Sequence, residues 1–71
     1  MSRWPSCKAR IVLAALLRNG WRIKRQAGTS HRVLAKQDLP DFVFAFHDQD
    51  EIGPKMLARI ATRTGLEPGD L

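Results

Sequence analysis

His31 and Arg32 are the two neighbouring side chains of this sequence that are best suited to phosphodiester chemistry. They follow Gly28, Thr29 and Ser30, a run of small residues that is typical of a turn. An imidazole can accept or donate a proton near neutral pH, and a guanidinium carries a fixed positive charge. Together they could move a proton and offset negative charge on a phosphate, provided that the surrounding elements hold this turn at the surface.

His47 is the other histidine of the chain, and it precedes the acidic segment 48–51. General acid–base catalysis uses two proton-transfer groups, so His47 is a candidate for the second one. Its alternative role is to end a strand by bonding to a turn. Imidazole and carboxylates at this spacing can also hold Mg²⁺ or Mn²⁺, but acidic residues are favourable just before a helix. We therefore expect no metal and no cofactor.

Positive charge dominates the chain and is unevenly distributed. The formal net charge is +5 and the isoelectric point is about 10.4, which favours a polyanionic partner such as nucleic acid. Residues 1–37 include nine basic and no acidic residues, whereas residues 38–71 include three basic and seven acidic ones. The surface is therefore predicted to be polarised, with His31 in the basic half. Charge alone does not distinguish RNA from DNA or from a membrane surface.

The length and the cysteine content narrow the class of protein. A chain of 71 residues, 44% of them hydrophobic, is predicted to form one domain over residues 1–71. Cys7 is the sole cysteine, so an intrachain disulfide is excluded and a reducing compartment is favoured. No apolar run approaches the roughly 20 residues that span a membrane, and no signal-peptide pattern is present. We expect a cytoplasmic protein without a membrane partner.

Hydrophobic periodicity predicts a helix, three strands and a second helix. Val12, Leu13 and Leu16 follow a helical spacing that stops before Gly20, and Pro54 opens the second helix. The predicted bounds are 5–19 for the first helix, 21–26, 31–35 and 42–47 for the strands, and 53–65 for the second helix. Short turns between the strands predict the fold class α+β in the order α-β-β-β-α: a three-stranded antiparallel sheet with two helices on one face.

Two basic surfaces are predicted from this arrangement. Alternation along residues 21–26 places Arg22 and Lys24 on the solvent face of a half-buried strand. Lys55, Arg59 and Arg63 recur every four residues and form a stripe along the second helix. Both surfaces could contact phosphates, although such a stripe is also typical of any solvated helix face.

Phe42, Phe44 and Phe46 share one face of the third predicted strand. Rings that are interleaved with a basic chain could stack on nucleic-acid bases. A domain of this size needs its large apolar side chains inside, however, and these are its only phenylalanines. We therefore assign the three rings to the core.

The segment 20–32, Gly-Trp-Arg-Ile-Lys-Arg-Gln-Ala-Gly-Thr-Ser-His-Arg, resembles the signature of the HicA family of bacterial toxins. That signature is a glycine and an aromatic residue at the end of the first helix, an Arg-Gln pair, and a glycine-serine-histidine turn before the second strand. Phe46-His47 is similar to the end of the family's third strand, and residues 51–57 are similar to the start of its second helix. The resemblance implies a fold similar to the double-stranded RNA-binding domain. It also implies an endoribonuclease toxin that cleaves mRNA, is neutralised by a HicB-like antitoxin, and uses His31 as the catalytic histidine.

RNA supplies its own nucleophile, the 2′-hydroxyl, so such an enzyme only moves protons and stabilises charge at phosphorus, and no metal is required. In this hypothesis His31 acts as general base or acid, and a nearby cation offsets the charge of the phosphorane. The candidate RNA-binding residues are Arg22, Lys24, Arg32, Lys55, Arg59 and Arg63. Two alternatives remain open: a domain that binds double-stranded RNA without cutting it, and a module whose basic face docks an acidic partner.

Overall fold

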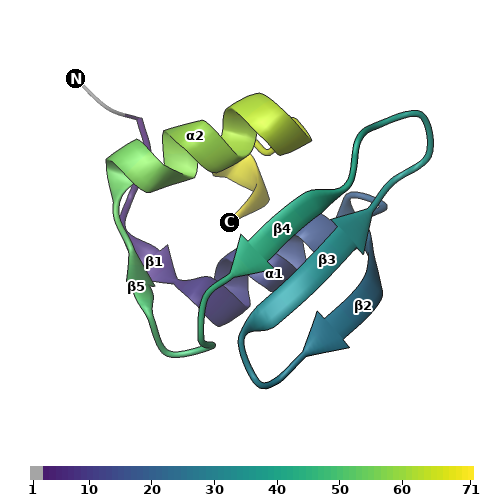
Figure 1. Ribbon diagram of the computed structural model, residues 1–71. Helices are drawn as coiled ribbons and strands as arrows, with labels where there is room; N and C mark the ends of the chain where they lie inside the picture. The colour runs from purple at the N-terminus through teal and green to yellow at the C-terminus, as the bar shows by residue number, and fades with distance from the viewer. Residues whose placement is uncertain (1–2) are drawn as a thin grey trace.

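The computed structural model describes residues 3–71. In this part of the chain, two α-helices and five strands are followed by a short 3-10 helix (Figure 1). The elements are β1 (Cys7–Lys8), α1 (Ala9–Arg18), β2 (Arg22–Ala27), β3 (His31–Ala35), β4 (Phe42–Ala45), β5 (Glu51–Ile52), α2 (Pro54–Thr64) and η1 (Pro68–Asp70). The order α1-β2-β3-β4-α2 confirms the predicted α-β-β-β-α arrangement, to which the structure adds β1, β5 and η1.

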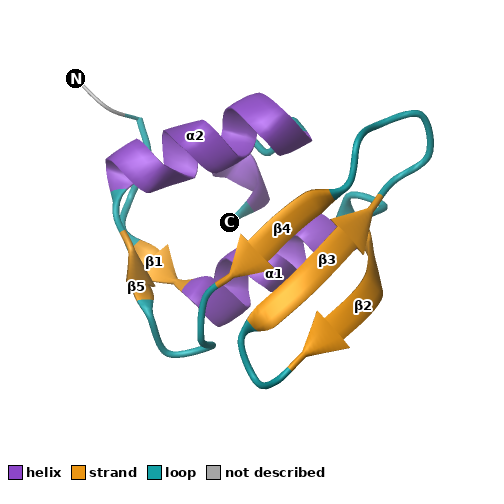
Figure 2. Cartoon of the chain, viewed as in Figure 1, coloured by secondary structure: helices purple, strands orange, loops and turns teal. Residues whose placement is uncertain are grey.

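Strands β2, β3 and β4 form an antiparallel sheet with β3 in the centre. Figure 2 shows α1 behind this sheet, whose other face is turned toward the viewer. Side chains of directly paired residues lie on the same face of the sheet, so the strand register shows which face each side chain occupies. We call the face that carries Arg32, Leu34 and Phe44 the inner face, and the face that carries His31 and Val33 the outer face.

The hydrophobic core lies between the inner face and the helices. Leu34 and Phe44 are fully buried and share one cluster with Leu16 of α1 and Leu57 of α2. Both helices therefore contribute to the core on the same face of the sheet, as predicted. The outer face is left without a covering element in the described part of the chain (Figure 2).

The three phenylalanines are core residues, which confirms their assignment against a base-stacking platform. Phe44 is fully buried, and Phe42 and Phe46 are partly buried against the same cluster. Phe44 and Phe46 make an edge-to-face contact with ring centroids 5.1 Å apart. Phe42 makes a similar contact with Trp21, at 6.4 Å.

Strand β2 departs from simple alternation at Lys24. Ile23 pairs with Leu34, but the next pair is Arg25 with Val33, so Lys24 is the extra residue of a β-bulge. A bulge turns the rest of the strand over relative to its partner. Arg25 consequently lies on the outer face, whereas strict alternation would place it on the inner one.

Helix α1 begins at Ala9, so the predicted start at residue 5 is wrong. The preceding residues form β1, which pairs antiparallel with β5 of a distant part of the chain. The backbone N–H of Ala9 donates to the carbonyl of Asp50 at 2.8 Å, and the N–H of Arg10 donates to the carbonyl of Asp48 at 3.1 Å. These bonds satisfy donors that every helix start leaves unpaired, and they fix where α1 begins.

Smaller corrections apply to the other elements. β2 spans Arg22–Ala27 rather than 21–26, β4 ends at Ala45 rather than 47, and α2 spans Pro54–Thr64 rather than 53–65. Gly65 closes α2 with a φ of 77°, a left-handed conformation that favours glycine. No helix within residues 3–71 is both long and apolar enough to cross a bilayer.

The C-terminal segment packs against the end of α1. The side-chain amide of Asn19 donates to the Asp70 carboxylate at 3.0 Å, and Arg18 donates to the Asp70 carbonyl at 2.7 Å. The N–H of Glu67 also donates to that carboxylate, at 2.8 Å. The bond from Glu67, followed by the one from Asn19, holds the pKa of Asp70 below its usual value.

Candidate functional site

His31 is the first residue of β3, and its side chain lies exposed on the outer face. Its backbone pairs with Ala27 on one side and with Ala45 on the other. Within residues 3–71, no hydrogen bond or ion pair engages its imidazole. Because both neighbouring side chains are methyl groups, a phosphate can approach the imidazole from solvent.

The predicted turn of Gly28, Thr29 and Ser30 connects β2 to β3 and positions His31. Gly28 has a φ of 67°, which a residue without a Cβ adopts readily. The side-chain amide of Gln26 donates to the Gly28 carbonyl at 3.2 Å. His31 therefore projects from a turn that is held by a local hydrogen bond, at one end of a three-stranded sheet.

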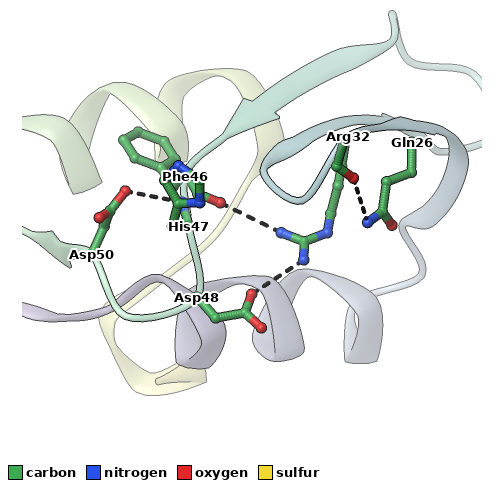
Figure 3. A network of polar contacts seen from close by, with 7 residues as sticks. Gln26, Arg32, Phe46, His47, Asp48 and Asp50 are labelled. Carbon is green, nitrogen blue, oxygen red and sulfur yellow. Dashed lines mark hydrogen bonds and ion pairs between the residues drawn. The ribbon is translucent and has the colours of Figure 1, made fainter.

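Arg32 points to the inner face and does not join His31, because successive residues of a strand alternate between faces. The residue is only 8% exposed. Its guanidinium donates to the carboxylate of Asp48 at 3.2 Å and to the carbonyl of Phe46 at 3.5 Å (Figure 3). Both contacts lie on the core side of the sheet, so the structure gives Arg32 a structural environment instead of a place beside a phosphate on the outer face.

The loop that Arg32 contacts, residues 46–50, carries His47. The N–H of His47 donates to the Asp50 carboxylate at 2.9 Å, and the N–H of Asp50 donates back to the His47 carbonyl at 2.9 Å (Figure 3). His47 comes two residues after Ala45, the cross-strand partner of His31. The register therefore brings the two histidines to the same end of the sheet.

The acidic residues that follow His47 have partners in β3, in their own loop and next to α1. Asp48 bonds to Arg32, Asp50 bonds to the His47 N–H, and Glu51 lies 3.6 Å from Lys8. These acids precede α2, and none of them falls within its first turn. Among residues 3–71, no group of three or more His, Cys, Asp or Glu side chains is arranged to hold a metal ion.

Arg25 is a diagonal neighbour of His31 on the outer face, a relation that the sequence analysis missed. It lies two residues before Ala27, the partner of His31. Diagonal pairs of this kind are about 7–8 Å apart, within reach of a long side chain. The bulge at Lys24 brings Arg25 to this face, and simple alternation gives no sign of it. The one available signal was the Arg-Gln pair in the HicA-like signature.

Lys24 crosses the outer face from β2 toward β4. Its ammonium lies 2.7 Å from the carboxylate of Asp41, the residue before β4. Lys24, Asp41, Arg25 and Val33 line a hollow of about 220 Å³. Val33, two residues after His31 on the outer face, and its partner Arg25 form the end of the hollow nearer the histidine, whereas Asp41 lies toward the other end of the sheet.

The remaining predicted RNA-binding residues lie away from His31. Arg22 pairs with Ala35, at the opposite end of β3. Lys55, Arg59 and Arg63 are exposed on α2. Arg63 lines, together with Lys36, a larger hollow of about 550 Å³ that opens at the end of β3 far from His31. This hollow is therefore separate from the two histidines.

The chain matches a model of a known protein family. The family model described as the HicA toxin of bacterial toxin–antitoxin systems matches residues 9–66, well over half of the chain. The chain belongs to the HicA toxin family. Comparisons with curated proteins and with solved structures gave no match.

The HicA match begins at the first residue of α1 and ends just after α2. It therefore includes the three-stranded sheet, the turn before His31 and the loop that carries His47. Membership of a toxin–antitoxin family means that the chain is a toxin that acts with an antitoxin partner.

Proposed function

We propose that this HicA toxin is an endoribonuclease that cleaves mRNA by acid–base catalysis at His31 and is neutralised by a HicB-like antitoxin. The observation that carries the proposal is the exposed imidazole of His31 on an open sheet face, with Arg25 as its diagonal neighbour. Family membership supports the toxin role. Because mRNA is the proposed substrate, the proposed place of action is the cytoplasm.

We also infer a fold similar to the double-stranded RNA-binding domain. The supporting observation is the order α1-β2-β3-β4-α2, with both helices contributing to one core on the inner face. The outer face then remains free for a partner.

In the proposed step, the 2′-hydroxyl of RNA loses its proton to a general base while its oxygen attacks the adjacent phosphorus. The bond from phosphorus to the 5′-oxygen breaks, and that oxygen takes a proton from a general acid. The products are a 2′,3′-cyclic phosphate and a free 5′-hydroxyl. We assign the two proton transfers to His31 and His47, which lie at the same end of the sheet. The step needs no metal ion.

Negative charge grows on the phosphorane oxygens during this step, and a nearby cation stabilises it. We assign this role to Arg25, which lies on the outer face, whereas Arg32 bonds to Asp48 on the inner one. Phosphates farther along the RNA are proposed to contact Arg22 and the stripe on α2. Such contacts position a nucleic acid without reading its sequence.

The outer face also offers a route by which an antitoxin could inhibit RNA cleavage. An acidic antitoxin that covers His31 and Arg25 excludes RNA and neutralises the positive charge together. An acidic partner also complements the net charge of +5. The HicB-like partner is therefore proposed to dock on the outer face.

The test uses RNA oligomers that carry a single 2′-deoxy nucleotide. The purified toxin is expected to cleave the all-ribose oligomer in EDTA and to leave a 2′,3′-cyclic phosphate. One 2′-deoxy substitution at the cleaved nucleotide should abolish cleavage there, and the same substitution two nucleotides away is the control. Cleavage at the deoxy position contradicts the proposed nucleophile. Tight binding without any cleavage favours the non-catalytic RNA-binding alternative instead.

A further inference from the structure

The hollow lined by Lys24, Arg25, Val33 and Asp41 lies on the outer face, with Val33 and Arg25 at the end nearer His31 and Asp41 toward the other end of the sheet, and it is not used by the proposed proton transfers. Its volume of about 220 Å³ is smaller than that of most pockets for drug-sized ligands. A hollow of this size suits a single planar base. Val33 and His31 are two residues apart on the same face of β3, which corresponds to roughly 7 Å. A single nucleotide can bridge that distance.

We propose that this hollow is a nucleobase subsite that receives a base adjacent to the scissile phosphate and favours guanine. The proposal deepens the proposed ribonuclease function and rests on it. Val33 provides an apolar floor, and its cross-strand neighbour Val43, 48% exposed, extends that floor. Apolar atoms suit the flat face of a base.

The walls of the hollow carry complementary hydrogen-bonding groups. The Asp41 carboxylate accepts hydrogen bonds, and the Lys24 ammonium, 2.7 Å away, holds it in place and donates them. The Watson–Crick edge of guanine presents two adjacent donors, N1–H and N2–H, beside the acceptor O6. The two donors match the two oxygens of Asp41, while Lys24 can donate to O6. Uracil, cytosine and adenine lack that pair of adjacent donors.

Single-stranded RNA exposes this edge, and proteins that read RNA sequence commonly bind unpaired bases through it. A well-placed bidentate contact to a base gives a discrimination of about tenfold or more. Asp41 is therefore a specificity-determining residue in this proposal, distinct from the groups that move protons.

The first experiment measures binding without catalysis. Guanosine, adenosine, cytidine and uridine 3′-monophosphates are titrated into the wild-type protein, and the methyl resonances of Val33 are followed by NMR. Guanosine monophosphate is expected to shift them at a concentration about tenfold lower than uridine monophosphate does. Equal responses to all four nucleotides, or no response at Val33, overturn the subsite.

The second experiment maps cleavage positions in a long RNA for wild type and for Asp41→Asn. Asp41→Asn is expected to lower the preference for guanine next to the cut by about tenfold. The control is Asp38→Asn, which makes the same charge change in the same connection outside the hollow. An unchanged preference in Asp41→Asn overturns the subsite while cleavage itself still supports the ribonuclease. If guanosine monophosphate shifts the Val33 resonances but the protein cuts no RNA, the subsite is supported and the proposed ribonuclease function is contradicted.

Discussion

The two faces of the three-stranded sheet differ in what surrounds their side chains, even at adjacent positions. On the inner face, Arg32 is bonded to Asp48 and Phe44 is fully buried among the helices. On the outer face, His31 is exposed and Val43 is 48% exposed. The inner face of β3 and β4 therefore carries the residues that stabilise the fold, and the outer face of the same two strands carries the candidate catalytic residue. Substitutions on the outer face should therefore leave the free energy of unfolding unchanged, and substitutions on the inner face should leave RNA cleavage by the folded protein unchanged.

The largest effect on stability is expected from Phe44→Ala, compared with Val43→Ala. Removing the Phe44 ring leaves a cavity in the core and should cost about 3–5 kcal/mol in the free energy of unfolding, whereas Val43→Ala should cost far less. Urea unfolding followed by circular dichroism measures both values. If Phe44→Ala does not fold, Phe44→Leu should still be clearly less stable than Val43→Ala. If the Phe44 variants were as stable as Val43→Ala, the inner face would not be the one that stabilises the fold.

The next comparison sets Arg32→Ala against Arg25→Ala. Arg32→Ala removes charge-assisted hydrogen bonds to the loop of residues 46–50 and should cost about 1.5–3 kcal/mol. Arg25 is exposed, so Arg25→Ala should change the free energy of unfolding by no more than about 0.5 kcal/mol.

Cleavage should respond in the reverse order at a temperature where both variants are folded. Arg25→Ala is expected to lower the rate of RNA cleavage more than Arg32→Ala does. Arg32→Ala that is as stable as wild type but has lost all affinity for RNA would instead support the original assignment of Arg32 to RNA binding.

The smallest expected effect concerns Asp70, which fastens the C-terminal segment to α1. Hydrogen bonds from Glu67 and Asn19 lower the pKa of Asp70 in the folded state, so its contribution to stability is full above the ordinary value of about 3.8. That contribution is lost as the pH falls through the lowered folded pKa. Wild type should therefore be slightly more stable than Asp70→Asn at pH 6, and the difference should shrink below pH 3.8. A difference that grows on acidification contradicts the sign of the shift. Thermal unfolding across this pH range gives the measurement.

Much of this architecture is readable from the sequence because long segments keep one periodicity. The spacing of Val12 and Leu16 marks α1, and alternation around Phe44 marks β4. Alternation along β3 also separates His31 from Arg32, although the chemistry of the two side chains suggested that they act together. That separation shows that the strand pattern decides which neighbouring groups can share a site.

Three features depend on contacts between distant segments, so local patterns do not reveal them. Strands β1 and β5 have two residues each, which is too short for any period to be recognised. The bulge at Lys24 is fixed by pairing with β3, and it alone brings Arg25 to the outer face. The ion pair of Asp48 with Arg32, and the hydrogen bonds from the start of α1 to the carbonyls of Asp48 and Asp50, become apparent only when β3 and α1 meet the loop of residues 46–50.

The most direct test of the division between the faces is His31→Ala, measured for both cleavage and stability. General acid–base groups contribute about 10²–10⁴-fold to a rate, so the rate of RNA cleavage should fall by that factor. Because the side chain is exposed, the free energy of unfolding should change by no more than about 0.5 kcal/mol. A folded His31→Ala protein that cleaves RNA at the wild-type rate would contradict the assignment of the chemistry to the outer face.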